Sequence, residues 1–206
     1  MTLFYDARGN IYGVASPALL RSRGIAVPDN AALAASTRQA WTGLAIASEC
    51  GWGTSLRPAE AKAYRCDGLL VGPFQAAPPY DLLIVNTDGS LAERSGNGLT
   101  IFAQALTDAG LMTQACELRV HHDQPDGVTP LVTGVEPAVY GQIHGFWLAL
   151  GQPAFGPQAV AAMGPESAET GPVNELAAIN PQWTRSQFVR IGNPHCVTLV
   201  EHVSAL

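Results

Sequence analysis

Residues 86–106 read NTDGSLAERSGNGLTIFAQAL, and an amphipathic helix is expected to begin within them. Four residues at the expected helix start could bind a ligand or take part in a reaction: Ser95, Gly96, Asn97 and Gly98. Glycine in a first helical turn costs about 1 kcal/mol relative to alanine, so two glycines suggest that something must approach the backbone closely. The unpaired N–H groups and the positive dipole end of a helix N-terminus suit a carboxylate or phosphate. The Asn97 amide can both donate and accept a hydrogen bond. Alternatively, Ser95 or Asn97 only caps the helix.

A second polar pattern lies in residues 189–201, VRIGNPHCVTLVE, which are typical of a strand, a sharp turn and a second strand. Asn193 precedes Pro194, and this order favours extended backbone at Asn193. The turn would hold the Asn193 amide and the His195 ring at a strand end, where sites are often assembled. The alternative is an ordinary hairpin turn without a role in binding.

The elements that must position these residues follow from hydrophobic periodicity and turn signals. A stripe of Leu99, Phe102, Leu106 and Ala109 predicts a helix that ends at Gly110. Residues 30–49 are predicted to be mostly helical, and residues 153–185 to be a long connection with short helical turns at PQAVAAM and PVNELAAI. Strands are expected within residues 3–16 on both sides of a turn where Gly9 and Asn10 would take positive φ, and within 67–74, 80–90, 116–122, 127–137, 139–151 and 188–201.

Composition limits the classes of protein that fit. Hydrophobic residues make up 47% of the 206 residues and charged residues 14%, which indicates a globular domain. The net charge is -6 and the 11 Lys and Arg residues are scattered, which argues against nucleic-acid and membrane partners. No apolar run reaches the roughly 20 residues of a membrane span, and the N-terminus lacks the features of a secretory signal. We therefore expect a cytoplasmic protein.

Cysteine and histidine patterns do not indicate a metal site. Cys50, Cys66, Cys116 and Cys196 are widely spaced without a CxxC pair, which favours buried free thiols over a disulfide framework. Cys196 in particular is expected to be a small buried side chain. Residues 121–123 read His-His-Asp, but adjacent strand residues point to opposite faces, which argues against both rings binding one ion.

Taken together, five segments resemble the diaminopimelate epimerase family, in the same order and with similar spacing along nearly the whole chain. NTDGSLAERSGNG resembles its Asn-Ala-Asp-Gly-Ser turn followed by Met-Cys-Gly-Asn-Gly, and IGNPHCV its Gly-Asn-Pro-His turn. LALGQPAFGP is similar to its Met-Gly-x-Pro-x-Phe-x-Pro segment, and CDGLLV to its Ala-Asp-Gly-Leu-Leu strand. ARGNIYGV is similar to the end of its His-Gly-x-Gly-Asn-Asp-Phe motif, although the His and the Asp-Phe are missing.

The resemblance implies an α/β (α+β) fold of two similar units, each a β-sheet wrapped around a central helix, with substrate in the cleft between them. The units would be residues 1–115 and an incomplete second unit at 116–206. It also implies an amino-acid epimerase or racemase without pyridoxal phosphate or metal, by default in lysine or cell-wall precursor synthesis. Two cysteines at the helix N-termini would exchange the Cα proton, because a helix N-terminus lowers the pKa of a thiol.

The resemblance implies a role for individual residues of this chain. It implies that Asn86 and Asn193 bind the amino and carboxyl groups of the substrate. Asn10 matches an N-terminal asparagine, and His195 matches an active-site histidine. The helix-start segment that would hold one end of the substrate is Gly96, Asn97 and Gly98.

Two departures from the family pattern affect the predicted activity. Ser95 stands where the first catalytic cysteine is expected, and a serine hydroxyl should be a poor base for a Cα proton. The segment that carries the second catalytic cysteine in the family has no counterpart before Leu206. The residues would therefore belong to a longer product or to a shortened relative that forms a homodimer or binds another chain.

Two classes of function remain open from the sequence. The first is an altered epimerase or racemase acting on a small amino acid or carboxylate, with Ser95 and His195 as catalytic candidates. The second is a relative that binds a small carboxylate or a partner chain without catalysis, or that performs one-base lyase or isomerase chemistry. Ser95 favours the second class, whereas the retained Asn86, Asn97, Asn193 and His195 favour the first.

Overall fold

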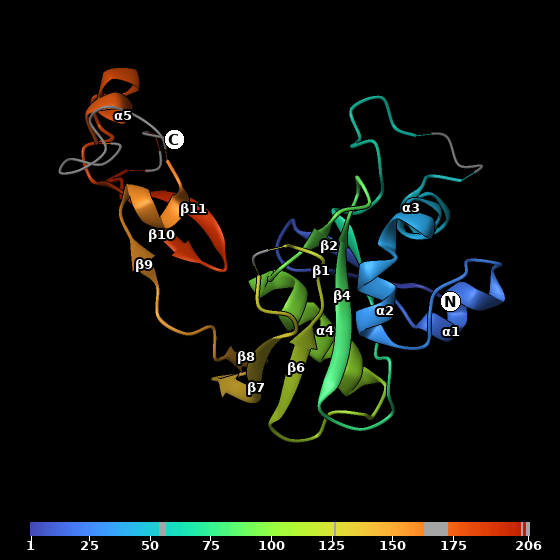
Figure 1. The fold of residues 1–206 in the computed structure, drawn as a ribbon. Helices are drawn as coiled ribbons and strands as arrows, with labels where there is room; N and C mark the ends of the chain where they lie inside the picture. Colours follow the sequence, from blue (N-terminus) through green and yellow to red (C-terminus); the bar gives the residue numbers. More distant parts are fainter. Residues whose placement is uncertain (54–56, 126, 163–172, 203, 205–206) are drawn as a thin grey trace. The chain divides into compact units, whose positions relative to one another are not determined.

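The chain folds into two compact units, Met1–Ala149 and Leu150–Leu206, which are described separately below (Figure 1). The computed structural model describes residues 1–53, 57–125, 127–162, 173–202 and 204. None of the helices within these ranges has the length and the apolar character needed to cross a membrane.

The first unit is built on one mixed sheet with strand order β1-β2-β3-β4-β6-β7-β8, and β5 pairs with β4. The β2–β3 and β4–β6 pairs are parallel, and the other pairs are antiparallel. The strands are β1 (Leu3–Asp6), β2 (Ile11–Ala15), β3 (Gly68–Val71), β4 (Tyr80–Asn86), β5 (Leu91–Ala92), β6 (Cys116–Val120), β7 (Leu131–Tyr140) and β8 (Ile143–Leu148).

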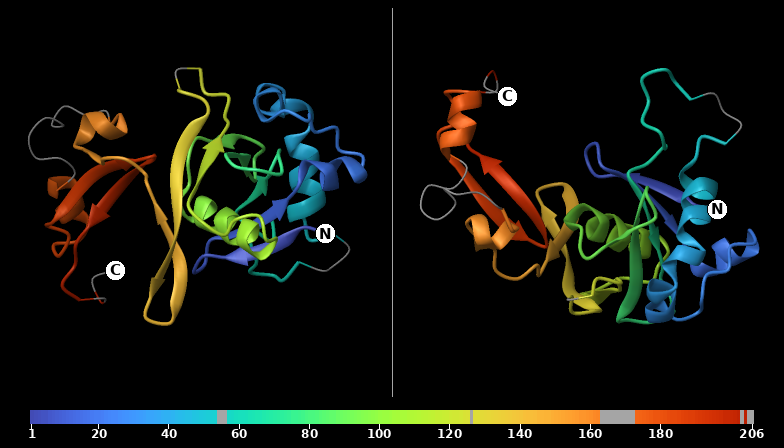
Figure 2. Two further views of the ribbon diagram at one scale, coloured as in Figure 1. Left: turned by 90° about the horizontal axis from the view of Figure 1, so that it is seen from below. Right: turned by 45° about the horizontal axis from the view of Figure 1, so that its top comes forward.

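This sheet curls around the helix α4 (Gly96–Asp108), as Figure 2 shows. Helix α4 contacts both β2 and β8, which lie near opposite ends of the strand order. Leu99, Phe102 and Leu106 are buried, whereas Ala109 is exposed, so the predicted apolar stripe ends one turn early. The expectation of a sheet wrapped around a central helix is confirmed for this unit.

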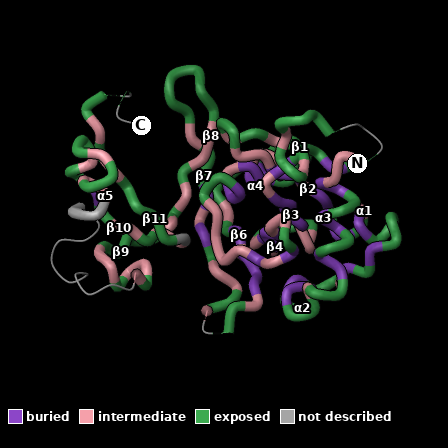
Figure 3. Tube along the Cα trace, turned by 90° about the horizontal axis from the view of Figure 1, so that it is seen from above, coloured by how far each residue is buried: buried purple, intermediate pink, exposed green. Residues whose placement is uncertain are grey.

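A layer of short helices packs against the same sheet: α1 (Pro17–Ser22), α2 (Ala31–Ser36), the 3-10 turn η1 (Arg38–Ala40) and α3 (Thr42–Cys50). Their apolar side chains form a core with β3 and β4 that includes Trp41, Ile46 and Leu83. All four residues of β3 are buried, as expected for a strand covered on both faces. Figure 3 shows this concentration of buried residues around β3, β4 and the surrounding helices.

The second unit contains a three-stranded antiparallel sheet of order β11-β10-β9. Its elements are β9 (Ala154–Phe155), η2 (Pro157–Val160), α5 (Val173–Ile179), β10 (Ser186–Ile191) and β11 (Asn193–Thr198). The short helical turns predicted at PQAVAAM and PVNELAAI are confirmed, while residues 163–172 of the predicted connection lie outside the described part of the chain.

The division of the chain into Met1–Ala149 and Leu150–Leu206 does not test the domain boundary predicted after residue 115, which stays a prediction. Strands β6, β7 and β8 follow that boundary in sequence, and they extend the sheet of the first unit. They therefore belong to the compact unit that contains α4.

The cysteines are free thiols, but the four differ in burial. Cys50 and Cys66 are buried as expected, and a hydrogen bond between them raises the pKa of Cys50 and lowers that of Cys66. Cys116 is half-buried. The interpretation of Cys196 as buried is wrong, because it is exposed on β11, the edge strand of the three-stranded sheet.

Candidate functional site

Ser95 is the N-cap of α4, and its Oγ accepts the Gly98 N–H at 3.1 Å. The interpretation of Ser95 as a helix cap is therefore confirmed, and it does not exclude a further role of this serine. The N–H groups of Gly96 and Asn97 form no hydrogen bond among those described for the chain, and both residues are exposed. The helix start consequently offers two donors at its positive dipole end.

The two glycines of this segment have different surroundings. A Cβ on Gly96 would meet no atom within 4 Å, so the backbone there is open. A Cβ on Gly98 would lie 3.2 Å from Ser95 Cβ and 3.4 Å from Leu70 Cδ2. The absence of a side chain at residue 98 is therefore explained by packing against the cap and the sheet, and the open approach to the helix is at Gly96.

A chain of hydrogen bonds joins Asn97 to residues far away in sequence. Asn97 Nδ2 donates to Asn10 Oδ1 at 3.2 Å, and Asn10 Nδ2 donates to Asp67 Oδ2 at 3.1 Å. A carboxylate can only accept, so Asp67 fixes which end of the Asn10 amide faces Asn97. Asn97 Oδ1 and its second amide hydrogen are then left for other partners.

Asp67 is held in its ionised form by its neighbours. Burial by itself raises the pKa of this carboxyl, but hydrogen bonds from Lys62, from the Ile11 N–H and from Asn10 bring the pKa below its usual value. The Lys62 Nζ lies 2.5 Å from Asp67 Oδ1, and the Ile11 N–H donates to Oδ2 at 2.8 Å. Asp67 is therefore a stable acceptor that anchors Asn10 beside the helix start.

The turn before β2 places Asn10 next to this carboxylate. The positive φ angles fall on Arg8 and Gly9, not on Gly9 and Asn10 as expected. The Gly9 N–H bonds Asp6 Oδ1, and the Ala7 N–H bonds the Asn10 carbonyl. Asn10 is free to take the geometry that its contacts with Asp67 and Asn97 require.

Asn86 lies at the end of β4, in one cross-strand row with Gly68 and Tyr12. Its Nδ2 donates to Ser90 Oγ at 3.0 Å, and its backbone closes the turn that leads to β5. Among the described contacts, Asn86 binds this turn and not the Asn10–Asn97 chain. It therefore lies on the sheet that carries the cluster without joining its hydrogen bonds.

The remaining predicted residues belong to the second unit. His195 is exposed on β11, opposite Val189 of β10, and Gly192 with φ +75° makes the turn between the strands. Asn193 pairs with Ile191 through its backbone, while its side chain lies outside the described part of the structure. The role predicted for these two residues stays a prediction.

The histidines at 121 and 122 engage separate partners. His121 Nε2 lies 3.0 Å from Asp81 Oδ1, whereas His122 Nε2 lies 3.0 Å from the Val128 carbonyl. In the described ranges, no group of three or more His, Cys, Asp or Glu side chains is arranged to hold a metal ion.

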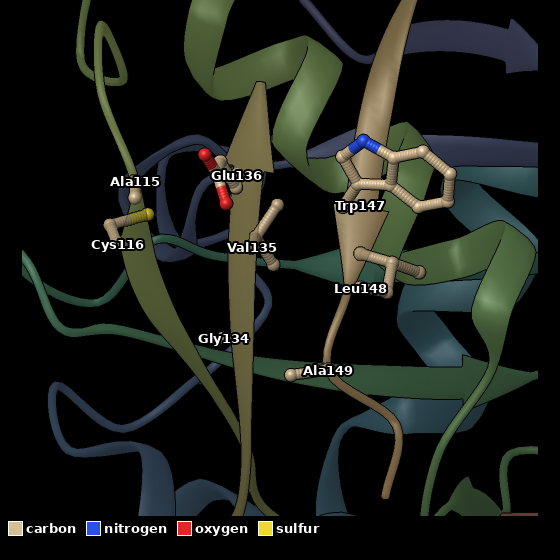
Figure 4. Close-up of a pocket in the computed structure, with 8 residues that line it drawn as sticks. All are labelled: Ala115, Cys116, Gly134, Val135, Glu136, Trp147, Leu148 and Ala149. Atoms are coloured by element: carbon tan, nitrogen blue, oxygen red, sulfur yellow. The ribbon is translucent and has the colours of Figure 1, made fainter. Parts of the chain in front are cut away.

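A pocket of about 310 Å³ lies at β6, β7 and β8, and its lining residues are not among the predicted site residues (Figure 4). Its lining is mainly apolar, with Cys116 and Glu136 as the ionisable groups. Burial, followed by the nearby Glu117 charge, raises the pKa of Cys116, which makes this thiol a weak nucleophile. The pocket therefore offers no reactive pair for the predicted chemistry.

The chain is a mixed α/β protein whose curled sheet surrounds the helix α4. A polar cluster of Asp67, Asn10, Asn97 and Ser95 lies at the start of that helix. No protein-family model matches the chain. It is 29% identical over 140 residues to diaminopimelate epimerase 2 of a Nostoc species, an alignment that covers 68% of this chain and 45% of the relative. It is 32% identical over 143 residues to diaminopimelate epimerase of Moorella thermoacetica, covering 67% of this chain and 46% of the relative.

The chain is therefore diaminopimelate epimerase-like, which confirms the resemblance seen in its motifs. It spans a little less than half the length of these curated relatives. A second Nostoc relative, diaminopimelate epimerase 1, is 28% identical over 150 residues.

Sequence reasoning missed two residues beside the helix start: Asp67, which anchors Asn10, and Tyr12, whose hydroxyl lies 3.5 Å from Ser95 Oγ. Asp67 is the acidic residue of the CDGLLV segment, and Tyr12 follows Asn10 by two positions, where the family motif has phenylalanine. Both positions were visible in motifs, but their roles depend on contacts between residues distant in sequence.

Proposed function

We propose that this chain contributes the substrate-binding unit of a cofactor-independent amino-acid epimerase of the diaminopimelate epimerase type, altered at the first base. The observation that carries the proposal is the Asp67–Asn10–Asn97 hydrogen-bond chain beside the open N–H groups of Gly96 and Asn97. Similarity to proteins named diaminopimelate epimerase supports the same reaction class.

The substrate of the proposed reaction is a small amino acid that carries a carboxylate. Its carboxylate would bind the N–H groups at the start of α4, where the helix dipole favours negative charge. The Asn97 amide, oriented by Asn10, would hold a neighbouring polar group of the same molecule. Asn86 is proposed to contribute to this part of the site, and the substrate-binding roles that the resemblance implies for Asn193 and His195 are proposed as well.

Ser95 would act as a supporting group and not as the base. A hydroxyl loses its proton far less readily than a thiol, and Ser95 Oγ already accepts the Gly98 N–H. It can still donate a hydrogen bond to the substrate, while the Cα proton would be taken by the second thiol that the resemblance implies. We therefore propose that this chain's own unit binds and orients the substrate, and that its reaction is slower than that of a two-thiol enzyme.

The alternative is a relative that binds a small carboxylate or a partner chain without catalysis, or that runs one-base chemistry. The observation that favours it is the capping bond of Ser95, which gives the serine a structural role independent of catalysis. An N-cap serine contributes about 1 kcal/mol to helix stability.

Hydrogen–deuterium exchange at Cα of LL- and meso-diaminopimelate in D2O, followed by NMR, tests these proposals. The chain would be compared with Ser95→Cys and with any longer form that its gene encodes. We expect slow exchange in a form that supplies the second thiol, and faster exchange when Ser95→Cys is added to that form. Exchange with retention would identify one-base chemistry, and exchange with inversion would identify a two-base epimerase. Absence of exchange in every form would overturn the epimerase proposal and favour the binding protein.

A further inference from the structure

The Tyr12 side chain points its phenol at the cap of α4. Tyr12 is the second residue of β2 and is 7% exposed, and its hydroxyl is 3.5 Å from Ser95 Oγ. Hydrogen-bonded hydroxyl pairs are usually about 2.5–3.0 Å apart and most often near 2.7–2.8 Å, so the two hydroxyls must move closer together to form a strong hydrogen bond. Such contacts in unliganded sites often tighten when substrate binds.

The sheet fixes the direction of this ring. Tyr12 pairs with Gly68 of β3, and a Cβ on Gly68 would lie 2.8 Å from Tyr12 Cε1 and 2.7 Å from the Val85 carbonyl oxygen. The ring therefore occupies space that is open because residue 68 has no side chain. The position of the Tyr12 hydroxyl is a property of the strand register and not of a free surface rotamer.

Ser95 has hydrogen-bonding capacity left for this phenol. Its Oγ accepts one N–H, from Gly98, which leaves its proton and a second lone pair. Either hydroxyl can donate to the other. A shortened hydrogen bond to Tyr12 would restrict rotation of the Ser95 hydroxyl and determine where its proton points.

We propose that Tyr12 is a positioning residue for Ser95: its phenol donates to Ser95 Oγ and orients the Ser95 hydroxyl toward the substrate, and it would likewise donate to a thiolate placed at residue 95. The proposal rests on the proposed function for its meaning, since Ser95 is a candidate site residue. Its central contact is nevertheless measurable without turnover. A donor hydrogen bond to an anion lowers the pKa of the group that carries the charge.

The test introduces a titratable probe at residue 95. Ser95→Cys is compared with Ser95→Cys/Tyr12→Phe, and the iodoacetamide alkylation rate of the residue-95 thiol is followed against pH by peptide mass spectrometry, which separates this thiol from Cys116 and Cys196. We expect the titration midpoint to rise by roughly 0.5–1 pH unit when the phenol is removed. That shift is about a threefold to tenfold loss of thiolate below the midpoint.

Tyr80→Phe in the Ser95→Cys background is the matched control. Tyr80 is also buried in the first unit, and its hydroxyl donates to the Leu111 carbonyl at 2.7 Å. This control should leave the midpoint unchanged. Charges such as those of Asp67 and Arg94 are common to all three proteins and cancel in the comparison.

A midpoint that stays within about 0.2 pH unit on Tyr12→Phe would overturn the positioning role. Tyr12→Phe keeps the ring, and retained circular dichroism and an unchanged urea midpoint would show that the shift is local. If Cα exchange is detected in the serine form, Tyr12→Phe should lower its rate constant about tenfold with little change in KM. Because the thiol titration needs no turnover, its failure and the failure of the proposed function are distinguishable.

Discussion

At the residue scale, the candidate site is held together by Asp67. This carboxylate binds Lys62, the Ile11 N–H and Asn10, and through Asn10 it determines which way the Asn97 amide faces. Lys62 lies five residues before Asp67, whereas Ile11 and Asn10 lie 56 and 57 positions away. The orientation of the Asn97 amide therefore depends on an acidic residue that itself has no direct contact with the helix start among the described hydrogen bonds.

A pH dependence of stability follows from Asp67. Its folded pKa lies below the usual Asp value of about 3.9, so its contribution to the free energy of unfolding is complete above that value and is lost as pH falls through the lowered pKa. We expect Asp67→Asn to lower stability at neutral pH and to flatten the loss of stability on acidification. Urea unfolding from pH 7 to pH 2 measures both effects.

Asp29→Asn is the control for that experiment. Asp29 pairs with Arg21 at 2.9 Å, but its side chain is 91% exposed. Exposed ion pairs contribute little to stability, so this variant should follow the unmodified protein across the pH range. Equal curves for Asp67→Asn and the unmodified protein would contradict the anchoring role of Asp67.

At the element scale, close approach between β2, β3 and β4 shapes the site. Gly68 has Tyr12 on one neighbouring strand and Asn86 on the other. A Cβ at this position would meet both the Tyr12 ring and the Val85 carbonyl oxygen below 3.0 Å. Because Gly68 of β3 has no side chain, the Tyr12 phenol can reach the N-terminus of α4.

Gly68→Ala should therefore destabilise the protein by about 1–3 kcal/mol, because a methyl group is forced into a filled space beside backbone. The same change should move the Tyr12 ring, and with it the thiol midpoint of the Ser95→Cys form. Chemical denaturation measures the first effect, and the alkylation titration measures the second.

Gly145→Ala on β8 gives the comparison for this variant. A Cβ there would meet no atom within 4 Å, and its φ is not among the positive ones. We expect a change below about 0.5 kcal/mol, as for a surface substitution. An equal loss in the free energy of unfolding for Gly68→Ala and Gly145→Ala would show that crowding at Gly68 does not cause the destabilisation.

At the scale of the whole molecule, the buried core belongs to one of the two units. Every buried hydrophobic side chain in the described ranges lies at or before Val135, and Ser186 is the one buried residue described in the second unit. Burial of apolar surface is the main favourable term in folding. The first unit should therefore account for most of the cooperative stability.

A fragment of residues 1–149 tests this expectation. We expect it to fold by itself and to unfold in urea with a midpoint close to that of the full chain, because it retains the whole described apolar core. The slope of its transition should fall in proportion to the surface that it no longer contains. A fragment that unfolds without cooperativity would show that the second unit is required for stability.

The amino-acid sequence by itself determined the elements and the motifs. The Leu99-Phe102-Leu106 stripe, the turn residues and the cap at Ser95 act over a few positions along the chain, so α4 and the strands β1 to β4 were predictable from local patterns. The resemblance to diaminopimelate epimerases was likewise visible in short segments, since residue types at fixed spacing are a property of sequence.

Only the tertiary structure decided which of those residues meet. Asn97 bonds Asn10 across 87 positions, and Asn10 bonds Asp67 across 57. These contacts depend on strand register. A shift of the register by one residue would move every side chain of the strand to the opposite face of the sheet. The same register brings Tyr12 over Gly68 and against Ser95, and no local pattern encodes it because each partner comes from a different part of the chain.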